Sequence, residues 1–244
     1  FAGLFVLVGL GTAVFRAESL PGRLTPEVSA FAAAMEDKPE TYKPCHKNRS
    51  LAVYETQGPC VIGATEAPGP PDFVLWGDSH AAALEPAVST AAARFGRKGV
   101  MITSPGCAPL LDTWSEQQVP ACAGKRALAH DYATRVGIDT VILVSRWASK
   151  VSGKPGEHLE TLLRDAQTEG ATTPATARDV LRRGLDRTVT ALDPSGRKIW
   201  LVRQVPVLYH ALGQRTDFET LIARRHLAPW VPWLDMPEAP PRIP

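Results

Sequence analysis

The run Trp76-Gly77-Asp78-Ser79-His80 contains the side chain best placed for covalent chemistry. A serine hydroxyl becomes a nucleophile when a base removes its proton, and Ser79 follows an apolar run and precedes an Ala-rich one. At such a strand-to-helix turn, the free N–H groups and the dipole of the first helical turn favour the negative charge that develops in acyl transfer. The alternative is structural, because Asp78 or Ser79 could simply cap the helix. Turn chemistry alone leaves both alternatives open, and Ser79 is the candidate nucleophile of an acyl-transfer reaction.

The elements around Ser79 predict an α/β domain with a parallel sheet. Short apolar runs alternate with helical ones from Asp72 onward, and ligands bind at the carboxyl ends of strands in such folds. Strands are expected at residues 72–77, 98–103, 140–146 and 198–207, and helices at residues 80–95, 124–136 and 174–192. The polar stretch 149–173 is expected to be a loop or an inserted segment. A solvated face of the last helix is expected to carry Arg178, Arg182, Arg183 and Arg187, with a glycan or lipid-headgroup contact as the alternative.

The motif Gly77-Asp78-Ser79-His80, after an apolar strand, resembles the first signature block of the SGNH hydrolase superfamily, whose nucleophilic serine lies in a Gly-Asp-Ser motif. The longer form Trp-Gly-Asp-Ser-His-Ala, with flanking cysteine pairs and a preceding apolar segment, is similar to the C-terminal domain of bacterial acyltransferase family 3 proteins, which O-acetylate surface glycans. The likeness covers about residues 45–207. It implies an SGNH-hydrolase-like, flavodoxin-like three-layer fold and catalysis without a metal or organic cofactor.

The resemblance also implies an oxyanion hole formed by the N–H groups of Ser79 and Gly106. Gly106 is the candidate because it follows the second strand of the pattern, and a bare backbone lets an oxyanion approach closely. The alternative is that Gly106 is an ordinary turn residue fixed by a disulfide at Cys107. The superfamily's third block carries an Asn that donates to the same oxyanion, but the corresponding strand here ends in Val144-Ser145-Arg146-Trp147. Arg146 either donates to the oxyanion, holds a glycan or carboxylate, or pairs with a structural carboxylate. Trp147 either stacks on a sugar or packs in the core. Candidate substrate-binding residues are Asp78, Arg146 and Trp147.

The catalytic base is missing from the sequence pattern. The superfamily ends in Asp-x-x-His, which supplies the His that activates the serine and the Asp that orients it, and no Asp-x-x-His occurs in these 244 residues. Among the six histidines, His46 lies in an expected linker and His80 follows the nucleophile directly; His210 is the only in-chain substitute with a plausible location. We therefore expect the catalytic Asp and His beyond Pro244, a domain truncated at its C-terminus, and no activity from this chain alone.

Four cysteines form two sequential pairs with equal spacing, Cys45 with Cys60 and Cys107 with Cys122. No Cys-x-x-Cys motif suggests zinc or redox chemistry. Two local disulfides fit best, although the sequence allows three connectivities, and four reduced thiols in a cytosolic protein are the alternative. Disulfides indicate an oxidising compartment.

The apolar run Phe1–Phe15 would span roughly 22 Å as a helix, short of the roughly 30 Å hydrocarbon core. We interpret residues 1–16 as the end of a transmembrane helix, with a signal-peptide core or a buried globular helix as alternatives. Residues 17–71, rich in proline, are expected to be a linker and cap that contains the first cysteine pair, and residues 72–244 an incomplete SGNH-like domain. The expected location is the bacterial inner membrane, with the domain in the periplasm.

Composition and charge narrow the class of partner. With 44% hydrophobic residues the chain should fold, and a net charge of +2 gives no field that would attract nucleic acid. The resemblance implies an O-acyltransferase that moves an acyl group, acetyl in the simplest case, to lipopolysaccharide or another polysaccharide. An upstream membrane acyltransferase domain would supply the acyl donor. The rival interpretations are a secreted glycan acyl esterase and a non-catalytic glycan-binding module.

Overall fold

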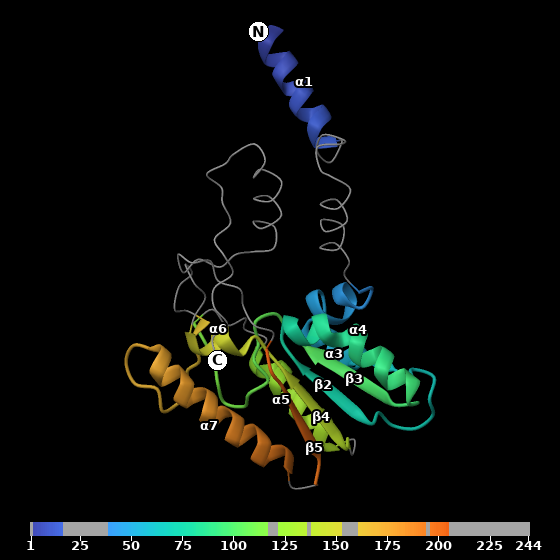
Figure 1. Ribbon diagram of the computed structural model, residues 1–244, viewed down its shortest axis with the longest axis vertical. Helices are drawn as coiled ribbons and strands as arrows, with labels where there is room; N and C mark the ends of the chain where they lie inside the picture. The colour runs from blue at the N-terminus through green and yellow to red at the C-terminus, as the bar shows by residue number, and fades with distance from the viewer. Residues whose placement is uncertain are drawn as a thin grey trace, which may run out of the picture. The chain divides into compact units, whose positions relative to one another are not determined.

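The computed structural model describes residues 2–16, 39–116, 122–135, 138–152, 161–193 and 196–204 (Figure 1). The chain divides into two compact units, with α1 (Ala2–Arg16) in one and Lys38–Pro206 forming the other. The apolar N-terminal run is therefore helical, and its Leu7, Val8 and Leu10 side chains are exposed. Within the described ranges, no helix is both long enough and apolar enough to cross a membrane.

A five-stranded sheet carries the second unit, in the order β1-β3-β2-β4-β5. Its strands are β1 (Cys60–Gly63), β2 (Phe73–Gly77), β3 (Lys98–Thr103), β4 (Thr140–Val144) and β5 (Lys198–Val202). The helices are η1 (Tyr42–Lys47), α3 (Leu51–Gln57), α4 (Ser79–Arg94), α5 (Cys122–Arg135), α6 (Trp147–Ser152) and α7 (Pro174–Leu192).

The central strands of this sheet are parallel, and their carboxyl ends meet at one edge. β1 pairs antiparallel with β3, whereas β2 pairs parallel with both β3 and β4, and β4 pairs parallel with β5. Gly77 at the end of β2 lies between Thr103 of β3 and Val144 of β4 in the register. The chain segments that follow these three residues therefore share one edge of the sheet, and the candidate site is built there.

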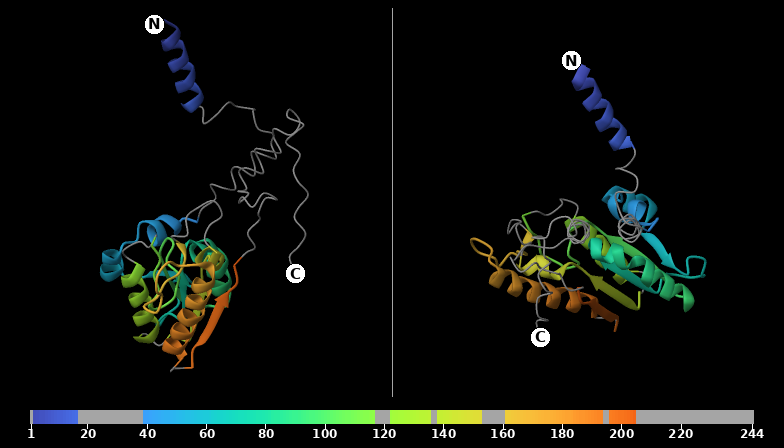
Figure 2. Two further views of the ribbon diagram at one scale, coloured as in Figure 1. Left: turned by 90° about the vertical axis from the view of Figure 1, so that its left-hand side faces the viewer. Right: turned by 45° about the horizontal axis from the view of Figure 1, so that its top comes forward.

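Alternating side chains of β2 build a core on each face of the sheet. Val74 and Trp76 pack on one face with residues of α3, α5 and α7. Phe73 and Leu75 pack on the other face with residues of α4 and η1. In the right-hand view of Figure 2, α4 and α7 accordingly lie on opposite sides of the strands.

The predicted α/β order is confirmed, because each expected strand and helix is present close to its expected start. Three details differ. β1 lies in the segment expected to be a linker and cap, and it extends the sheet beside β3. α6 begins at Trp147 and occupies the start of the stretch expected to be a loop. β5 ends at Val202, short of the expected Val207.

Candidate active site

Gly77 ends β2 and allows that strand to approach β4 closely. A Cβ at position 77 would overlap the carbonyl oxygen of Val144, so a larger residue would force the two strands apart. The Gly77 carbonyl accepts a hydrogen bond from the Ser104 N–H (3.1 Å), and the Asp78 N–H donates to the Val144 carbonyl (3.3 Å). The ends of β2, β3 and β4 are thus joined immediately before Ser79.

Asp78 is buried and serves as the N-cap of α4. Its Oδ1 accepts a hydrogen bond from the His80 N–H (2.8 Å), and its Oδ2 accepts from the Ser145 hydroxyl (2.6 Å) and the Arg146 N–H (2.9 Å). Burial by itself would raise the pKa of Asp78, but the nearby His80 imidazole, followed by these hydrogen bonds, outweighs burial and holds the pKa below its usual value. Asp78 therefore stays ionised and ties the start of α4 to the end of β4. Its predicted contact with substrate stays a prediction.

Ser79 is the first residue of α4, and its side chain is exposed. Neither its hydroxyl nor its N–H makes a hydrogen bond with any residue that the structure describes. The first N–H groups of a helix have no partner inside the helix, so they can bind an anion at this position. The serine is both accessible and placed beside donors suited to an oxyanion.

Gly106 lies in the loop after β3, with a positive φ of 70° and open space where a Cβ would stand. Its position is fixed on both sides. The next residue, Cys107, forms a disulfide with Cys122 at the start of α5, and the Lys150 ammonium group donates to the Gly106 carbonyl (2.5 Å). The Gly106 N–H makes no hydrogen bond among the described residues, so it too can bind an anion.

Ser79 and Gly106 open into one pocket of about 190 Å³, which we call the serine pocket. Its lining comprises Asp78, Ser79, Gly106, Ser115, Arg146, Ser149, Lys150 and Thr161. Within the described lining, Asp78 brings the one carboxylate, which is already hydrogen-bonded, whereas Arg146 and Lys150 bring two cations. The described lining therefore favours a negatively charged group near Ser79.

The structure distinguishes between the alternatives for Arg146 and Trp147. The Arg146 side chain lines the serine pocket and makes no ion pair or hydrogen bond with a described residue, which disfavours pairing with a structural carboxylate. The Trp147 indole N–H donates to the Val202 carbonyl (2.8 Å), and the partly buried side chain packs against the buried cluster of Ala108, Leu110, Leu163 and Val180. Trp147 is not among the described lining of the pocket, so the core alternative describes it better than sugar stacking does.

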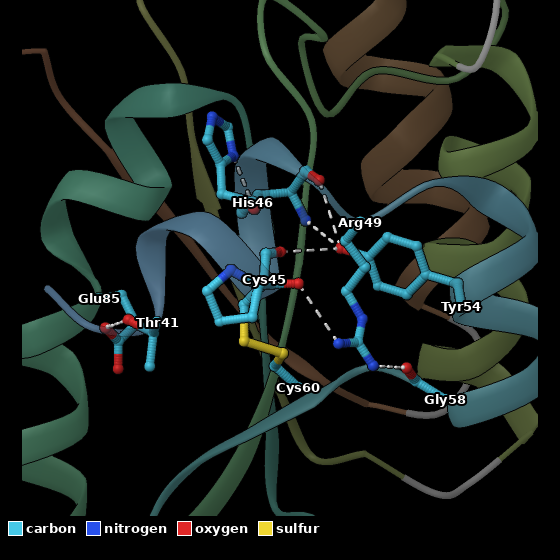
Figure 3. The surroundings of a disulfide bond; sticks show 10 residues. Thr41, Cys45, His46, Arg49, Tyr54, Gly58, Cys60 and Glu85 are labelled. Carbon is cyan, nitrogen blue, oxygen red and sulfur yellow. Dashed lines mark hydrogen bonds between the residues drawn. A yellow bond between two sulfur atoms is a disulfide. The ribbon is translucent and has the colours of Figure 1, made fainter.

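A cap formed by η1 and α3 supports the end of β3, three residues before Gly106 (Figure 3). The Tyr54 hydroxyl accepts a hydrogen bond from the Thr103 N–H (3.1 Å) and lies 3.4 Å from the Cys45 carbonyl. The Cys45–Cys60 disulfide joins η1 to β1. Because Thr103 is held from this side, the cap positions the strand end from which the Gly106 loop begins.

His46 belongs to the cap, although the sequence places it in a linker. It is buried, its Nδ1 lies 3.0 Å from the Thr103 hydroxyl, and its Nε2 has no hydrogen-bond partner among the described residues. Burial and the nearby positive charge of Lys125 lower its pKa to about 4, while Asp78 acts in the opposite direction. His46 is therefore neutral at physiological pH.

No described histidine is hydrogen-bonded to Ser79. The Nδ1 atom of His80 lies 3.5 Å from Asp78, and His46 bonds to Thr103. His210, the in-chain substitute considered from the sequence, lies outside the described residues. The described ranges also contain no group of His, Cys, Asp and Glu side chains that could hold a metal ion.

Sequence reasoning missed part of the serine pocket. Lys150 and Ser149 lie on the short helix α6, and Thr161 donates to the Ser149 carbonyl (2.9 Å) from the segment that follows. Ser115 reaches the pocket from the segment between the second cysteine pair. The two predicted disulfides, Cys45–Cys60 and Cys107–Cys122, are confirmed; the second closes the segment that contains Ser115, and its Cys107 directly follows Gly106.

Comparison with known proteins gives one family and one solved structure. The family model described as "SGNH domain (fused to AT3 domains)" matches residues 44–241. No curated protein matches the chain. Among solved structures, it is similar to the periplasmic domain of a lipopolysaccharide acetyltransferase from Salmonella ser. Paratyphi A, with 15% identity over 82% of this chain and 79% of that chain and a TM-score of 0.41.

Proposed function

Since this chain belongs to the family of SGNH domains that are fused to AT3 domains, we propose that it transfers an acyl group through Ser79 to a hydroxyl of a cell-surface glycan. The acyl group is acetyl in the simplest case, and the glycan is lipopolysaccharide or another polysaccharide. One observation carries the proposal. The Ser79 hydroxyl, exposed and without a hydrogen-bond partner among the described residues, opens into a pocket that also holds Gly106 and the cation of Arg146.

The proposed reaction has two halves. In the first, Ser79 Oγ attacks the acyl carbonyl carbon, its proton passes to a general base, and the base gives that proton to the donor's departing group, which leaves an acyl ester on Ser79. In the second, a sugar hydroxyl loses its proton to the same base and attacks the ester; the base then returns the proton to the departing Ser79 Oγ, which regenerates the serine and forms the acylated glycan. The general base is assigned to a histidine outside the described residues, because His80 and His46 have other partners within them.

The oxyanion of both halves is assigned to the N–H groups of Ser79 and Gly106 and to the Arg146 guanidinium. Arg146 replaces the Asn of the superfamily's third block in this role. Its backbone N–H is fixed by Asp78 (2.9 Å), so the side chain starts from a rigid position at the end of β4. A charged donor in a confined pocket stabilises a developing negative charge more strongly than a neutral amide does.

The setting proposed for this chemistry is outside the cytoplasm, in the periplasm and next to the inner membrane. Two disulfides with no free cysteine among the described residues support an oxidising compartment. The AT3 domain of the family description is the proposed source of the acyl donor. The exposed leucines and valine of α1 make this helix the proposed contact with the membrane.

Replacement of Ser79 tests the proposal. Ser79→Ala in the intact protein should abolish acylation of the cell-surface glycan, measured by NMR of the purified polysaccharide, with the protein still present in normal amount. Thr90→Ala, an exposed position on the same helix, is the matched control and should acylate normally. Unchanged acylation by Ser79→Ala would overturn the nucleophile and favour a glycan-binding module. Release of free acetate in place of glycan acylation by the wild type would favour an esterase.

A further inference from the structure

A second pocket, of about 800 Å³, lies beside the serine pocket. We call it the tryptophan pocket; its wall includes Thr113, Trp114, Arg126, Asp165, Gln167 and Arg187. The loop after β3, α5 and α7 contribute to it, as does the segment around residue 165.

The two pockets share a wall. Trp114 exchanges two backbone hydrogen bonds with Arg164 (2.9 and 2.8 Å), which fixes the loop after β3 against the segment after α6. Trp114 lines the tryptophan pocket, and the next residue, Ser115, lines the serine pocket. Consecutive Cα atoms are about 3.8 Å apart, so a chain of sugars bound in one pocket lies next to the other.

Arg126 provides a positive charge in the wall of the tryptophan pocket that no described carboxylate pairs with. Its side chain is only 7% exposed, and its one hydrogen bond within the described ranges goes to the Thr113 hydroxyl (3.3 Å). No described carboxylate lies within ion-pair distance of it. Burial lowers the pKa of Arg126 to about 10, and the charge of Asp112 offsets this only in part. A buried guanidinium without a carboxylate partner is costly unless an anion binds it.

The acidic groups of this pocket are already neutralised or exposed. Asp165 is buried and forms a two-bond ion pair with Arg183 (2.9 Å for each bond) and a longer one with Arg187 (3.4 Å). The bonds to Arg183 lower the pKa of Asp165 to about 2. Asp112 points largely into solvent, and its nearest cation is Arg187 at 3.9 Å. The prediction that Arg183 and Arg187 only form a solvated face is therefore wrong, because a buried carboxylate holds both.

Trp114 adds an apolar surface to this charge. The residue is 42% exposed although its backbone is fixed by the bridge to Arg164. An indole ring held rigidly at a pocket wall offers a flat face on which the C–H face of a sugar ring can pack. A guanidinium beside it can form two parallel hydrogen bonds to a carboxylate or phosphate group.

We propose that the tryptophan pocket binds a negatively charged sugar of the acceptor glycan, with its ring on Trp114 and its carboxylate or phosphate on Arg126. This assignment rests on the proposed function, since it names the class of glycan that reaches Ser79. The neighbouring sugar, across the shared wall, presents the hydroxyl that is acylated.

Direct binding tests this proposal without any acyl transfer. Two acidic probes are titrated calorimetrically into the 244-residue chain: a galacturonic acid trisaccharide and a trisaccharide that carries one sugar phosphate. Each is compared with its uncharged counterpart, the carboxyl-reduced or the dephosphorylated trisaccharide. At least one acidic probe should bind about tenfold more tightly than its counterpart, equivalent to about 1.4 kcal/mol. The probe that binds identifies the anion as carboxylate or phosphate.

Variants locate that binding. Arg126→Gln can retain the bond to Thr113. It should weaken binding of the acidic probe about tenfold and leave binding of the uncharged counterpart unchanged. Trp114→Ala, at an exposed position that does not disturb the core, should weaken binding of both the acidic probe and its uncharged counterpart. Arg182→Gln, an exposed arginine paired with Asp179, is the control and should bind as wild type does. Equal binding of acidic and uncharged probes, no binding of either acidic probe, or wild-type binding by Trp114→Ala would overturn the proposal.

The two proposals fail separately. Ser79→Ala should bind the acidic probe normally because Ser79 lies in the other pocket. If Ser79→Ala still acylates the glycan, the nucleophile is wrong and the binding result stands. If the acidic probes do not bind while Ser79→Ala loses acylation, the assignment of the tryptophan pocket to an acidic sugar is wrong and the assignment of Ser79 as nucleophile stands.

Discussion

The serine pocket and the tryptophan pocket share a wall but are built from different parts of the fold. The serine pocket lies over the ends of β2 and β4, where Asp78 joins two strands and the start of α4 through three short hydrogen bonds. The tryptophan pocket lies among a loop and two helices, and its volume is about 800 Å³ against about 190 Å³. A small pocket fixed by the sheet suits chemistry that depends on exact positions of atoms, whereas a wide pocket suits binding of a glycan.

The cations of the two pockets differ in the same way. Arg146 projects from a strand end whose backbone is fixed by Asp78, beside the serine hydroxyl. Arg126 is buried in a helix and bonds only to Thr113 among the described residues. If this division is correct, changes in the serine pocket should slow the chemical step, and changes in the tryptophan pocket should weaken glycan binding.

The largest effect is expected from Arg146→Gln. Loss of one charged oxyanion donor should lower kcat for glycan acylation by about 10²- to 10³-fold and leave KM for the glycan nearly unchanged. Steady-state kinetics of the intact protein measure both constants, and Arg182→Gln serves as the control at an exposed arginine. A raised KM with an unchanged kcat would contradict the division, because it would place Arg146 in glycan binding.

Removal of either disulfide should lower stability, but only removal of the second should also impair glycan acylation. Each joins cysteines 15 residues apart, so Cys45→Ser/Cys60→Ser and Cys107→Ser/Cys122→Ser should each cost about 3 kcal/mol of unfolding free energy. Only the second pair encloses Trp114 and Ser115, and its Cys107 directly follows Gly106. Under conditions in which both variants remain folded, measured by urea unfolding, only the second should lose glycan acylation. Equal acylation by the two variants would mean that the second disulfide does not position the pockets.

Gly77→Ala should damage the serine pocket through the strands. The added methyl overlaps the Val144 carbonyl, so β2 and β4 separate at their ends, at an expected cost of about 1–3 kcal/mol in urea unfolding. The binding of an acidic trisaccharide should survive, because the tryptophan pocket does not rest on this pair of strand ends. Gly170→Ala is the comparison: no atom lies within 4 Å of the added carbon, and only its positive φ of 62°, which Gly77 does not share, opposes a side chain there. A Gly77→Ala protein as stable as wild type would contradict the close approach of β2 and β4.

The smallest effect concerns Asp165, whose ion pairs hold Arg183 and Arg187 beside the tryptophan pocket. Its folded-state pKa of about 2 lies below its unfolded value, so its stabilising contribution is present above pH 4 and is lost as pH falls toward 2. Asp165→Asn should be less stable than wild type by about 1 kcal/mol at pH 6, a value reduced because its arginine partners are partly exposed. Thermal unfolding should show the stability difference between Asp165→Asn and wild type, here called the stability gap, narrowing toward pH 2. Asp179→Asn, from an exposed ion pair, should show no such gap. A gap independent of pH would remove the ion-pair explanation.

Local patterns in the sequence were sufficient to predict the sheet and the strand-end position of Ser79. Apolar runs bounded by Gly and Pro define β2, β3 and β4, and parallel strands bring Gly77, Thr103 and Val144 to one edge. β1 was not predicted because a four-residue strand has too little pattern and forms only by pairing with β3. Within the part of the chain described, this pairing turns an expected linker into an edge of the sheet.

The pockets were only partly predictable for the same physical reason. Ser79 and Gly106 were found because each follows a recognisable strand. Lys150 and Arg126 reach their pockets through tertiary packing of helices, and a lone basic residue on a helix normally indicates a solvated face. The ion pairs of Asp165 with α7 join residues 18 and 22 positions apart, which no local pattern encodes.

The most direct test of the central claim is to trap the acyl group on Ser79. The intact protein is mixed with its acyl donor in the absence of acceptor glycan, quenched in acid, digested, and analysed by mass spectrometry. The account predicts an acyl ester on the peptide that contains Ser79, which disappears when acceptor glycan is added and is absent from Ser79→Ala. Glycan acylation that proceeds with no acyl ester on Ser79, and that survives in Ser79→Ala, would contradict it.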